Sequence, residues 1–233
     1  MFIKMSDIEQ NIKILEDKIA KAAQKAEKNP EEITLVAVSK TVEPERIREA
    51  IRCGIRIIGE NRVQEAEEKF KQIPEEFEKH LVGHLQTNKA KKAVELFDMI
   101  QSVDSLKLAD EVSKRARQKG KTMDVLVEVK TSGEPTKFGL EPGEVHDLVT
   151  RLSDLEGISV KGLMTVGLFS SDMDQVRPCF KKLKHLFDKL KDANIPGIEM
   201  KYLSMGMTQD YEAAIEEGAN MIRIGTAIFG RRD

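Results

Sequence analysis

The chain has 233 residues, of which 40% are hydrophobic and 33% are charged. This length and composition suit one α/β domain over residues 1–233, with enough apolar residues for a substantial core. The net charge of −2 comes from interspersed acidic and basic residues, which argues against a nucleic-acid partner or an anionic membrane surface. No stretch reaches the ~20 apolar residues needed to cross a bilayer, so we expect no membrane partner.

Two cysteines, Cys53 and Cys179, lie far apart and fit no metal-ligand spacing. We therefore predict no metal site. The segment MFIKMSDIEQ at the start of the sequence lacks the apolar core of a signal peptide. A cytoplasmic location is expected from these two observations.

The chain alternates between apolar strands and amphipathic helices. Ser6 and Glu9 form a capping box for a first helix that ends before Asn29-Pro30. Asp104 is expected to cap the helix that follows the fourth strand. Predicted strands cover 33–40, 55–60, 80–85, 99–103, 123–130, 160–166, 200–203 and 220–229, and predicted helices cover 44–53, 61–71, 88–96, 105–119, 142–152, 176–190 and 209–217. Eight such units predict a single (β/α)8 TIM-type barrel with an extra N-terminal helix.

Lys40 ends the first predicted strand, ITLVAVSK. In a parallel barrel the carboxyl ends of the strands carry the chemistry, and a lysine withdrawn from water becomes a usable nucleophile toward carbonyl groups. Taken alone, a strand-end lysine more often buries its stem and keeps its ammonium group in water. A functional role for Lys40 therefore depends on other residues.

The loops after strands seven and eight of such barrels often bind phosphate. Here they contain Ser204 and Gly206 in the first loop and Gly225 and Thr226 in the second. Glycines let backbone N–H groups approach a phosphate, and hydroxyl groups donate hydrogen bonds to it. The two segments together predict a phosphate site.

Arg223 interrupts the apolar strand MIRIG, where an unpaired charge would be costly. It needs an acceptor, either a ligand or a neighbouring acid such as Glu128 or Glu60. A nucleophilic lysine, a phosphate site and an inward arginine together suggest a phosphorylated aldehyde held as an imine. Pyridoxal 5'-phosphate (PLP) fits, and so does the substrate of a Schiff-base sugar-phosphate aldolase.

A family resemblance separates these alternatives. The segments LVAVSKT, GENRVQE, LVGHLQTNK, FGL, GLMTV, LSMGMTQDYEAAI and IRIGTAIFG occur in this order between about residues 33 and 230. They resemble the PLP homeostasis protein family, whose fold is the barrel of the alanine racemase amino-terminal domain. The resemblance implies a cytoplasmic PLP-binding protein that buffers or delivers this vitamin B6 cofactor to PLP-dependent apoenzymes.

The same resemblance implies roles for individual residues. Lys40 would carry the Schiff base, and Asn61 would lie by the cofactor ring. Arg223 would face the pyridine nitrogen, where a permanently protonated guanidinium weakens the electron sink that PLP enzymes use. The phosphate would be held by Ser204, Gly206, Gly225 and Thr226.

We predict no catalytic residue and no robust turnover. Racemases of this fold use a second base, a tyrosine from a separate β domain, and we expect no such domain here. Tyr202 and Tyr211 are at positions more typical of packing than of catalysis. His84 and Lys137 are assigned no role. Lys137 lies in a polar loop at 131–139 that could cover the site. The alternative is an amino-acid racemase or another small PLP enzyme. Exposed helices without a large apolar stripe favour a monomer.

Overall fold

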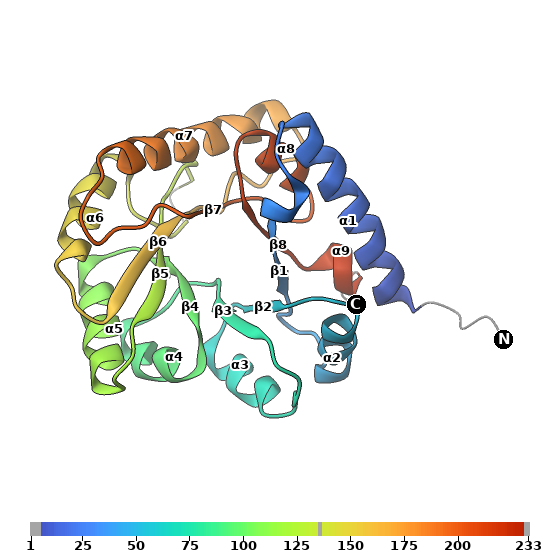
Figure 1. Ribbon diagram of the computed structural model, residues 1–233, viewed down its shortest axis with the longest axis horizontal. Coiled ribbons are helices and arrows are strands. Elements are labelled where there is room, and N and C mark those ends of the chain that lie inside the picture. Colours follow the sequence, from blue (N-terminus) through green and yellow to red (C-terminus); the bar gives the residue numbers. More distant parts are fainter. Residues whose placement is uncertain (1–5, 135–136, 231–233) are drawn as a thin grey trace.

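Eight parallel strands close into a barrel in the computed structural model, which describes residues 6–134 and 137–230. Each strand pairs with its neighbours in sequence, and β8 returns to pair with β1, as Figure 1 shows. The strands are β1 (Thr34–Val38), β2 (Ile57–Glu60), β3 (Glu78–Leu81), β4 (Met99–Val103), β5 (Met123–Glu128), β6 (Ile158–Met164), β7 (Tyr202–Ser204) and β8 (Met221–Ile224). The predicted barrel is confirmed. Two predictions fall partly outside the described residues. These are the absence of a signal peptide, which rests on a segment that includes residues 1–5, and the loop at 131–139, which includes residues 135–136.

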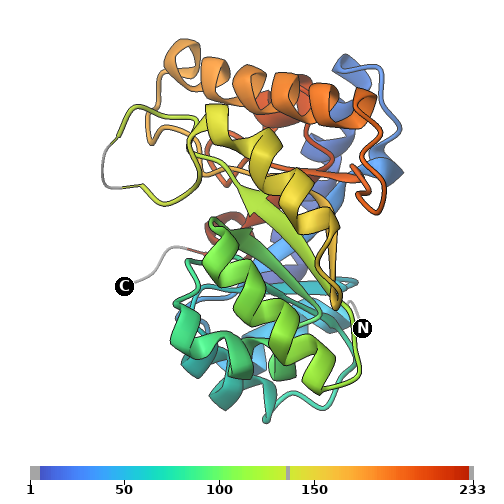
Figure 2. The same cartoon turned by 90° about the vertical axis from the view of Figure 1, so that its left-hand side faces the viewer.

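Helices surround the strands. The α-helices are α1 (Asp7–Lys25), α2 (Pro44–Arg52), α3 (Val63–Phe70), α4 (Ala90–Leu96), α5 (Leu106–Gln118), α6 (Val145–Ser153), α7 (Met173–Asp192), α8 (Tyr211–Glu216) and α9 (Thr226–Phe229), with short 3-10 turns at Pro30–Glu32, Thr87–Lys89 and Pro142–Glu144. α5, α6 and α7 cover one side of the barrel, as seen in Figure 2. No helix among the described residues is long and apolar enough to cross a membrane.

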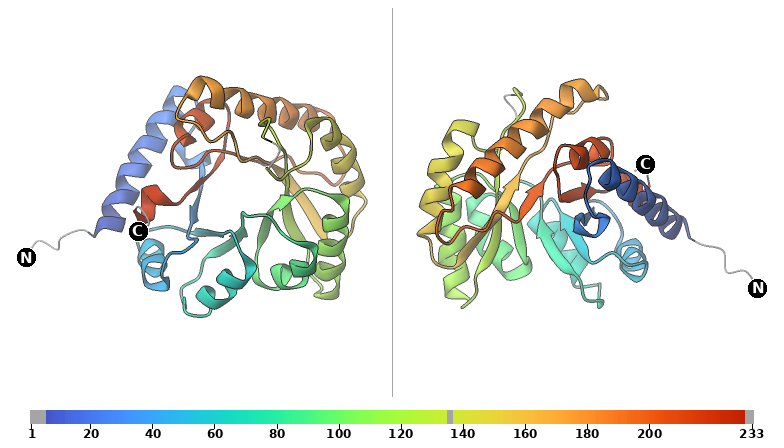
Figure 3. Two further views of the ribbon diagram at one scale, coloured as in Figure 1. Left: turned by 180° about the vertical axis from the view of Figure 1, so that it is seen from behind. Right: turned by 45° about the horizontal axis from the view of Figure 1, so that its top comes forward.

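The extra N-terminal helix is confirmed and packs on the outside of the barrel. The Ser6 side chain accepts a hydrogen bond from the Glu9 backbone N–H, as the predicted capping box requires. The apolar stripe of α1, which includes Ile8, Ile12 and Leu15, is buried. α1 lies beside α8 and α9, near the closure between β8 and β1 (Figures 1 and 3).

Two predictions of local structure were wrong. The apolar run 220–229 is not one strand: β8 ends at Ile224, and Thr226–Phe229 forms α9. Ser105, rather than Asp104, caps α5 through its side chain, which accepts from the Leu108 N–H at 3.4 Å. The Asp104 carboxylate instead lies 3.4 Å from the His84 imidazole.

The core has two parts, as strand alternation requires. Side chains that point outward from the strands pack against the helices in a large apolar cluster. A smaller cluster fills the barrel interior and is formed by Val36, Val82, Met99, Leu126, Met164 and Met221. On β1 the inward positions are Val36 and Val38, so the next inward position is Lys40.

Candidate functional site

A cavity of about 600 Å³ opens at the carboxyl ends of the strands. Its wall includes several residues that the sequence predicted for the cofactor, namely Lys40, Asn61, Arg223, Gly225 and Thr226. These residues come from the ends of β1, β2 and β8, which are adjacent in the barrel. The structure therefore brings together an amine, an amide, a guanidinium and a Gly-Thr segment around one space.

The turn that carries Lys40 is conformationally unusual. Thr41 has φ 61°, a left-handed conformation that a β-branched residue seldom adopts. The Val42 N–H closes the turn on the Ser39 carbonyl oxygen at 2.9 Å, and the Thr41 N–H donates to Glu65 Oε1 at 2.5 Å. Such a conformation costs of order 1–3 kcal/mol and persists only where neighbouring contacts hold it.

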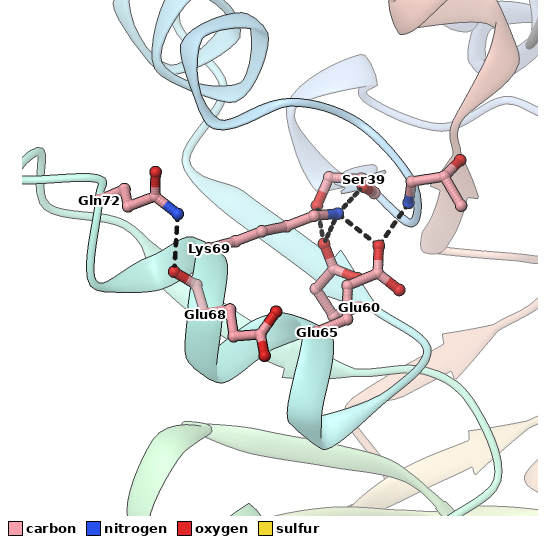
Figure 4. Close-up of polar contacts among 7 residues, drawn as sticks. Ser39, Glu60, Glu65, Glu68, Lys69 and Gln72 are labelled. Atoms are coloured by element: carbon pink, nitrogen blue, oxygen red, sulfur yellow. Dashed lines mark hydrogen bonds and ion pairs between the residues drawn. The ribbon is translucent and has the colours of Figure 1, made fainter.

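A second lysine, Lys69 of α3, holds the turn between Ser39 and Thr41 through hydrogen bonds to residues of the turn and to its carboxylate partners (Figure 4). Its Nζ donates to the Ser39 carbonyl oxygen at 2.6 Å, to Glu65 Oε1 at 2.6 Å and to Glu60 Oε1 at 3.0 Å. Ser39 Oγ also donates to Glu60 Oε1, at 2.7 Å. Lys69 is only 9% exposed, so its charge is held by these acceptors and fixes the turn before Lys40. Lys69 was not among the site residues predicted from the sequence.

The two carboxylates of this cluster differ in their environment. Burial raises the pKa of Glu60, although the bonds from Ser39 and Lys69 oppose it, and Glu60 Oε2 is buried without a hydrogen-bond partner. Burial also acts to raise the pKa of Glu65, but hydrogen bonds from Lys69 and the Thr41 N–H outweigh it and lower the pKa. Glu65 is therefore the ionised anchor of the turn.

Arg223 is 4% exposed and is held by neutral acceptors. Its Nη1 donates to Ser204 Oγ at 2.6 Å, and its Nη2 donates to the Thr165 carbonyl oxygen at 2.7 Å. Burial lowers the pKa of Arg223 to about 10, against the attraction of Glu128 and Asp210, so the guanidinium stays protonated at neutral pH. The alternative prediction of an ion pair with Glu60 is wrong, because Glu60 pairs with Lys69.

Glu128 faces the barrel interior at the end of β5, since it alternates with the inward Leu126. It is 6% exposed, and its Oε2 has no hydrogen-bond partner. Burial and the nearby Asp104 charge raise the pKa of Glu128 to about 7, and Arg223 only partly compensates. Its attraction to Arg223 is thus electrostatic, without a hydrogen bond between the two side chains.

Ser204 and Gly206 lie behind the cavity wall. The Ser204 hydroxyl is fully buried, accepts from Arg223 and donates to Gln101 Oε1 at 2.7 Å. Gly206 has φ 96°, and a Cβ there would lie 2.6 Å from the Ala214 Cβ. Met207 and Thr208 line the cavity in their place. Thr208 was not predicted from the sequence, although it is a hydroxyl residue two positions after a loop glycine and so resembles Thr226, which directly follows Gly225.

Lys137 and Phe138, in the described part of the 131–139 loop, contact residues at the edge of the site. Lys137 Nζ donates to the Gly167 carbonyl oxygen at 2.6 Å, beside the cavity-lining residues Leu168, Phe169 and Ser170. Phe138 stacks on His84 with ring centroids 3.8 Å apart and an interplanar angle of 11°. These contacts connect residues 137–138 to the end of β3 and to the segment after β6.

The tyrosines lie away from the cavity. Tyr202 begins β7 and packs against the inner apolar cluster, with the Lys201 ammonium 4.7 Å from its ring centroid. Tyr211 is 4% exposed, and burial raises its pKa to about 12. Neither lines the cavity. The described cavity wall therefore contains no tyrosine that could act as a second base.

Comparison with known proteins identifies the family. The family model for the alanine racemase N-terminal domain matches residues 3–233. A pyridoxal phosphate homeostasis protein of Aquifex aeolicus is 42% identical over 229 residues, covering 98% of this chain and 99% of the relative. One from Escherichia coli is 37% identical over 233 residues, covering 98% of both. The chain belongs to the pyridoxal phosphate homeostasis protein family.

Solved structures agree with this family assignment. A protein of Bifidobacterium adolescentis, described as unknown, superposes with a TM-score of 0.92 at 36% identity and covers 98% of both chains. PipY of Synechococcus elongatus, solved with PLP bound, gives a TM-score of 0.81 at 35% identity, covering 91% of this chain and 100% of PipY. An alanine racemase of Clostridium difficile has a TM-score of 0.76 at 16% identity and covers 96% of this chain and 57% of the racemase, which supports a common fold alone.

Proposed function

We propose that this chain binds PLP reversibly as a Schiff base on Lys40 and acts in intracellular PLP homeostasis, without robust turnover of its own. The observation that carries the proposal is the meeting of Lys40 and Arg223 in one cavity with Gly225 and Thr226. An amine for an aldehyde, a fixed cation and a Gly-Thr segment suit a phosphorylated pyridine aldehyde. The relative PipY, of the same barrel, is described with PLP bound.

The donor set fits the group chemically. PLP supplies an electron sink when bound, and this chain supplies a guanidinium beside it that stays protonated and cannot accept a ring proton. Gly225 and Thr226 are the residues assigned to the phosphate. Ser204 and Gly206 were predicted for it as well, but they lie behind the cavity wall, where Ser204 accepts from Arg223. Asn61 is assigned a place beside the ring.

The proposed role is storage or delivery rather than catalysis, and the recipients would be PLP-dependent apoenzymes. The placement of Tyr202 and Tyr211 away from the cavity supports this. A monomeric state and a cytoplasmic location belong to the same proposal; both Cys53 and Cys179 are free thiols, as is usual in reducing compartments. The racemase alternative would require a second base at the open face of the cavity.

Trapping the Schiff base tests the assignment of Lys40. Mixing cofactor-free protein with PLP should give an imine absorbance band, and borohydride should fix the cofactor onto the peptide that contains Lys40. A Lys40→Ala variant should lose both signals, whereas the matched surface variant Lys13→Ala should keep them. An unchanged band in Lys40→Ala would contradict the proposal.

Two further measurements separate storage from turnover. Fast exchange of the Cα hydrogen for deuterium, with inversion, in any of a panel of amino acids would favour the racemase alternative. Transfer of PLP from the loaded protein to an apoenzyme, compared with free PLP at equal concentration, tests delivery.

A further inference from the structure

A second cavity, of about 480 Å³, lies beside the proposed cofactor cavity. Asn61 lines both of them. The rest of its wall comes from the start of α3 and from the segment between β3 and α4, with Phe138 on its edge. None of these residues except Asn61 has a role in the proposed function.

The wall of this second cavity is cationic. Its lining includes two basic residues, Arg62 and Lys89, and none of its lining residues is an aspartate or a glutamate. No carboxylate among the described residues forms an ion pair with Lys89. Two basic lining residues without an acidic one favour an anion in this cavity.

The carboxylates nearest in sequence are already occupied. Glu65 accepts from Lys69 and the Thr41 N–H. Glu67 lies 2.7 Å from Lys92 Nζ and 3.1 Å from Lys71 Nζ. Glu65 also attracts Arg62, and Asp104 lies 3.4 Å from the His84 imidazole. These carboxylates offset part of the positive charge, but no acidic side chain lines the cavity itself.

Polar and aromatic groups complete the wall. The side-chain amides of Gln64 and Gln86 can donate hydrogen bonds, as can Nε2 of His84, whose Nδ1 lies 3.4 Å from Asp104 Oδ2. The Phe138 ring, stacked on His84, is 56% exposed and leaves an apolar face available at the edge. Donors on several sides and a flat apolar edge suit a small organic molecule with one oxyanion group.

We propose that this cavity is a binding site for the carboxylate or phosphate group of a small metabolite, with Arg62 and Lys89 as its charge partners. The planar guanidinium of Arg62 can donate two parallel hydrogen bonds to either oxyanion, and Lys89 adds a point charge. Because Asn61 belongs to both walls, an occupant of this site changes how the neighbouring cavity holds its ligand; that second statement rests on the proposed function. The anion site would thus regulate cofactor release.

The binding half of the proposal can be tested without PLP. We expect inorganic phosphate or acetate, added to the full chain at constant ionic strength, to shift the His84 imidazole signal in an NMR titration that saturates. His84→Gln assigns the signal among the histidines. The double variant Arg62→Gln/Lys89→Gln should bind the anion at least about tenfold more weakly, because two charge-assisted hydrogen bonds are lost. The control double variant Lys18→Gln/Lys21→Gln, which removes the same charge from exposed positions on α1, should bind as the unmodified protein does.

The outcomes are distinct. Saturation by phosphate but not by acetate identifies a phosphate site, and the reverse identifies a carboxylate site. A linear response, a response equal to that of sodium chloride, or an unchanged affinity in Arg62→Gln/Lys89→Gln would overturn the proposal. Circular dichroism of each variant confirms that it is folded before the comparison is made.

The regulatory half uses the PLP-loaded protein. Saturating anion should change the rate at which the imine band decays after dilution, and the change should disappear in Arg62→Gln/Lys89→Gln. An unchanged rate in the unmodified protein would refute regulation. If no imine band forms at all, the proposed function fails, whereas the His84 titration still decides whether the anion site exists.

Discussion

Replacing Glu128 by glutamine should stabilise the protein, increasingly so as the pH rises. Glu128 is 6% exposed, and its pKa is raised from 4.5 to about 7, chiefly because burial disfavours the charged carboxylate. The folded protein therefore binds this proton more tightly than the unfolded chain does. As the pH rises through the interval from 4.5 to about 7, ionisation favours the unfolded state, so the free energy of unfolding falls.

The size of the effect follows from the difference in pKa. At about 1.4 kcal/mol per pKa unit, the full shift corresponds to about 3 kcal/mol of lost stability above pH 7. Most of this loss, roughly 2 to 3 kcal/mol, lies between about pH 5 and pH 8. Glutamine has the shape of the protonated acid and does not titrate. The variant should equal the unmodified protein within about 1 kcal/mol near pH 5 and exceed it by about 2 to 3 kcal/mol near pH 8.

Urea unfolding of the cofactor-free proteins at several pH values measures this difference directly. Glu144→Gln, at an exposed position in the turn before α6, serves as the control and should differ little from the unmodified protein at any of these pH values. A Glu128→Gln difference that stays constant with pH would refute the reasoning. A variant less stable near pH 8 would show that Glu128 works there as the ionised partner of Arg223.

Three other substitutions test the supports of the site. Lys69→Met should lower the free energy of unfolding by about 3–5 kcal/mol, because it leaves buried carboxylate oxygens without their cation. The double variant Glu60→Gln/Lys69→Met should recover part of this loss in the same urea denaturation assay. Equal losses in the single and double variants would argue against the pairing of Glu60 with Lys69. Gly206→Ala should cost more than about 1 kcal/mol, since its Cβ would lie 2.6 Å from the Ala214 Cβ at φ 96°, whereas Gly143→Ala, with nothing within 4 Å of the added carbon, should be nearly neutral. Ser204→Ala should lower the thermal midpoint, since about 1–3 kcal/mol is lost when Arg223 and Gln101 lose their shared hydroxyl, and an unchanged midpoint would show that water replaces it.

The barrel could be predicted from the sequence because buried parallel strands are nearly continuous apolar runs between helical segments. The same signal fails where an apolar run continues past the sheet. Residues Thr226–Phe229 are as apolar as β8, yet the last pairing of β8 with β1 is Ala37 with Ile224. Beyond that pair the chain has no strand partner, and it turns into a helix. Composition alone does not mark that point.

The site could be predicted in part. Lys40 and Arg223 stood out because each places a charge at the end of or within an apolar strand, and both line the cavity. The position of Ser204 could not be read from the loop motif, because the hydroxyl lies on the inward face of β7 and is taken by Arg223. The role of Lys69 was invisible because it acts across thirty positions of sequence on the Ser39 carbonyl oxygen. Such contacts depend on how α3 crosses the end of β1.

A series of hydrogen-bonded side chains runs from Arg223 through the barrel interior, and it bears on whether the site stores or transforms its ligand. Ser204 Oγ accepts from Arg223 and so directs its own hydrogen to Gln101 Oε1; the Gln101 amide then donates to His80 Nδ1 at 2.9 Å. His80 Nε2 lies 2.7 Å from the Glu78 carboxylate at the other end of the barrel. These hydrogen bonds, with the one from Arg223 Nη2 to the Thr165 carbonyl oxygen, hold the guanidinium in place. In the proposed function, a cation held in this way and protonated near neutral pH would oppose the ring protonation on which carbanion chemistry depends, and it would suit reversible binding instead.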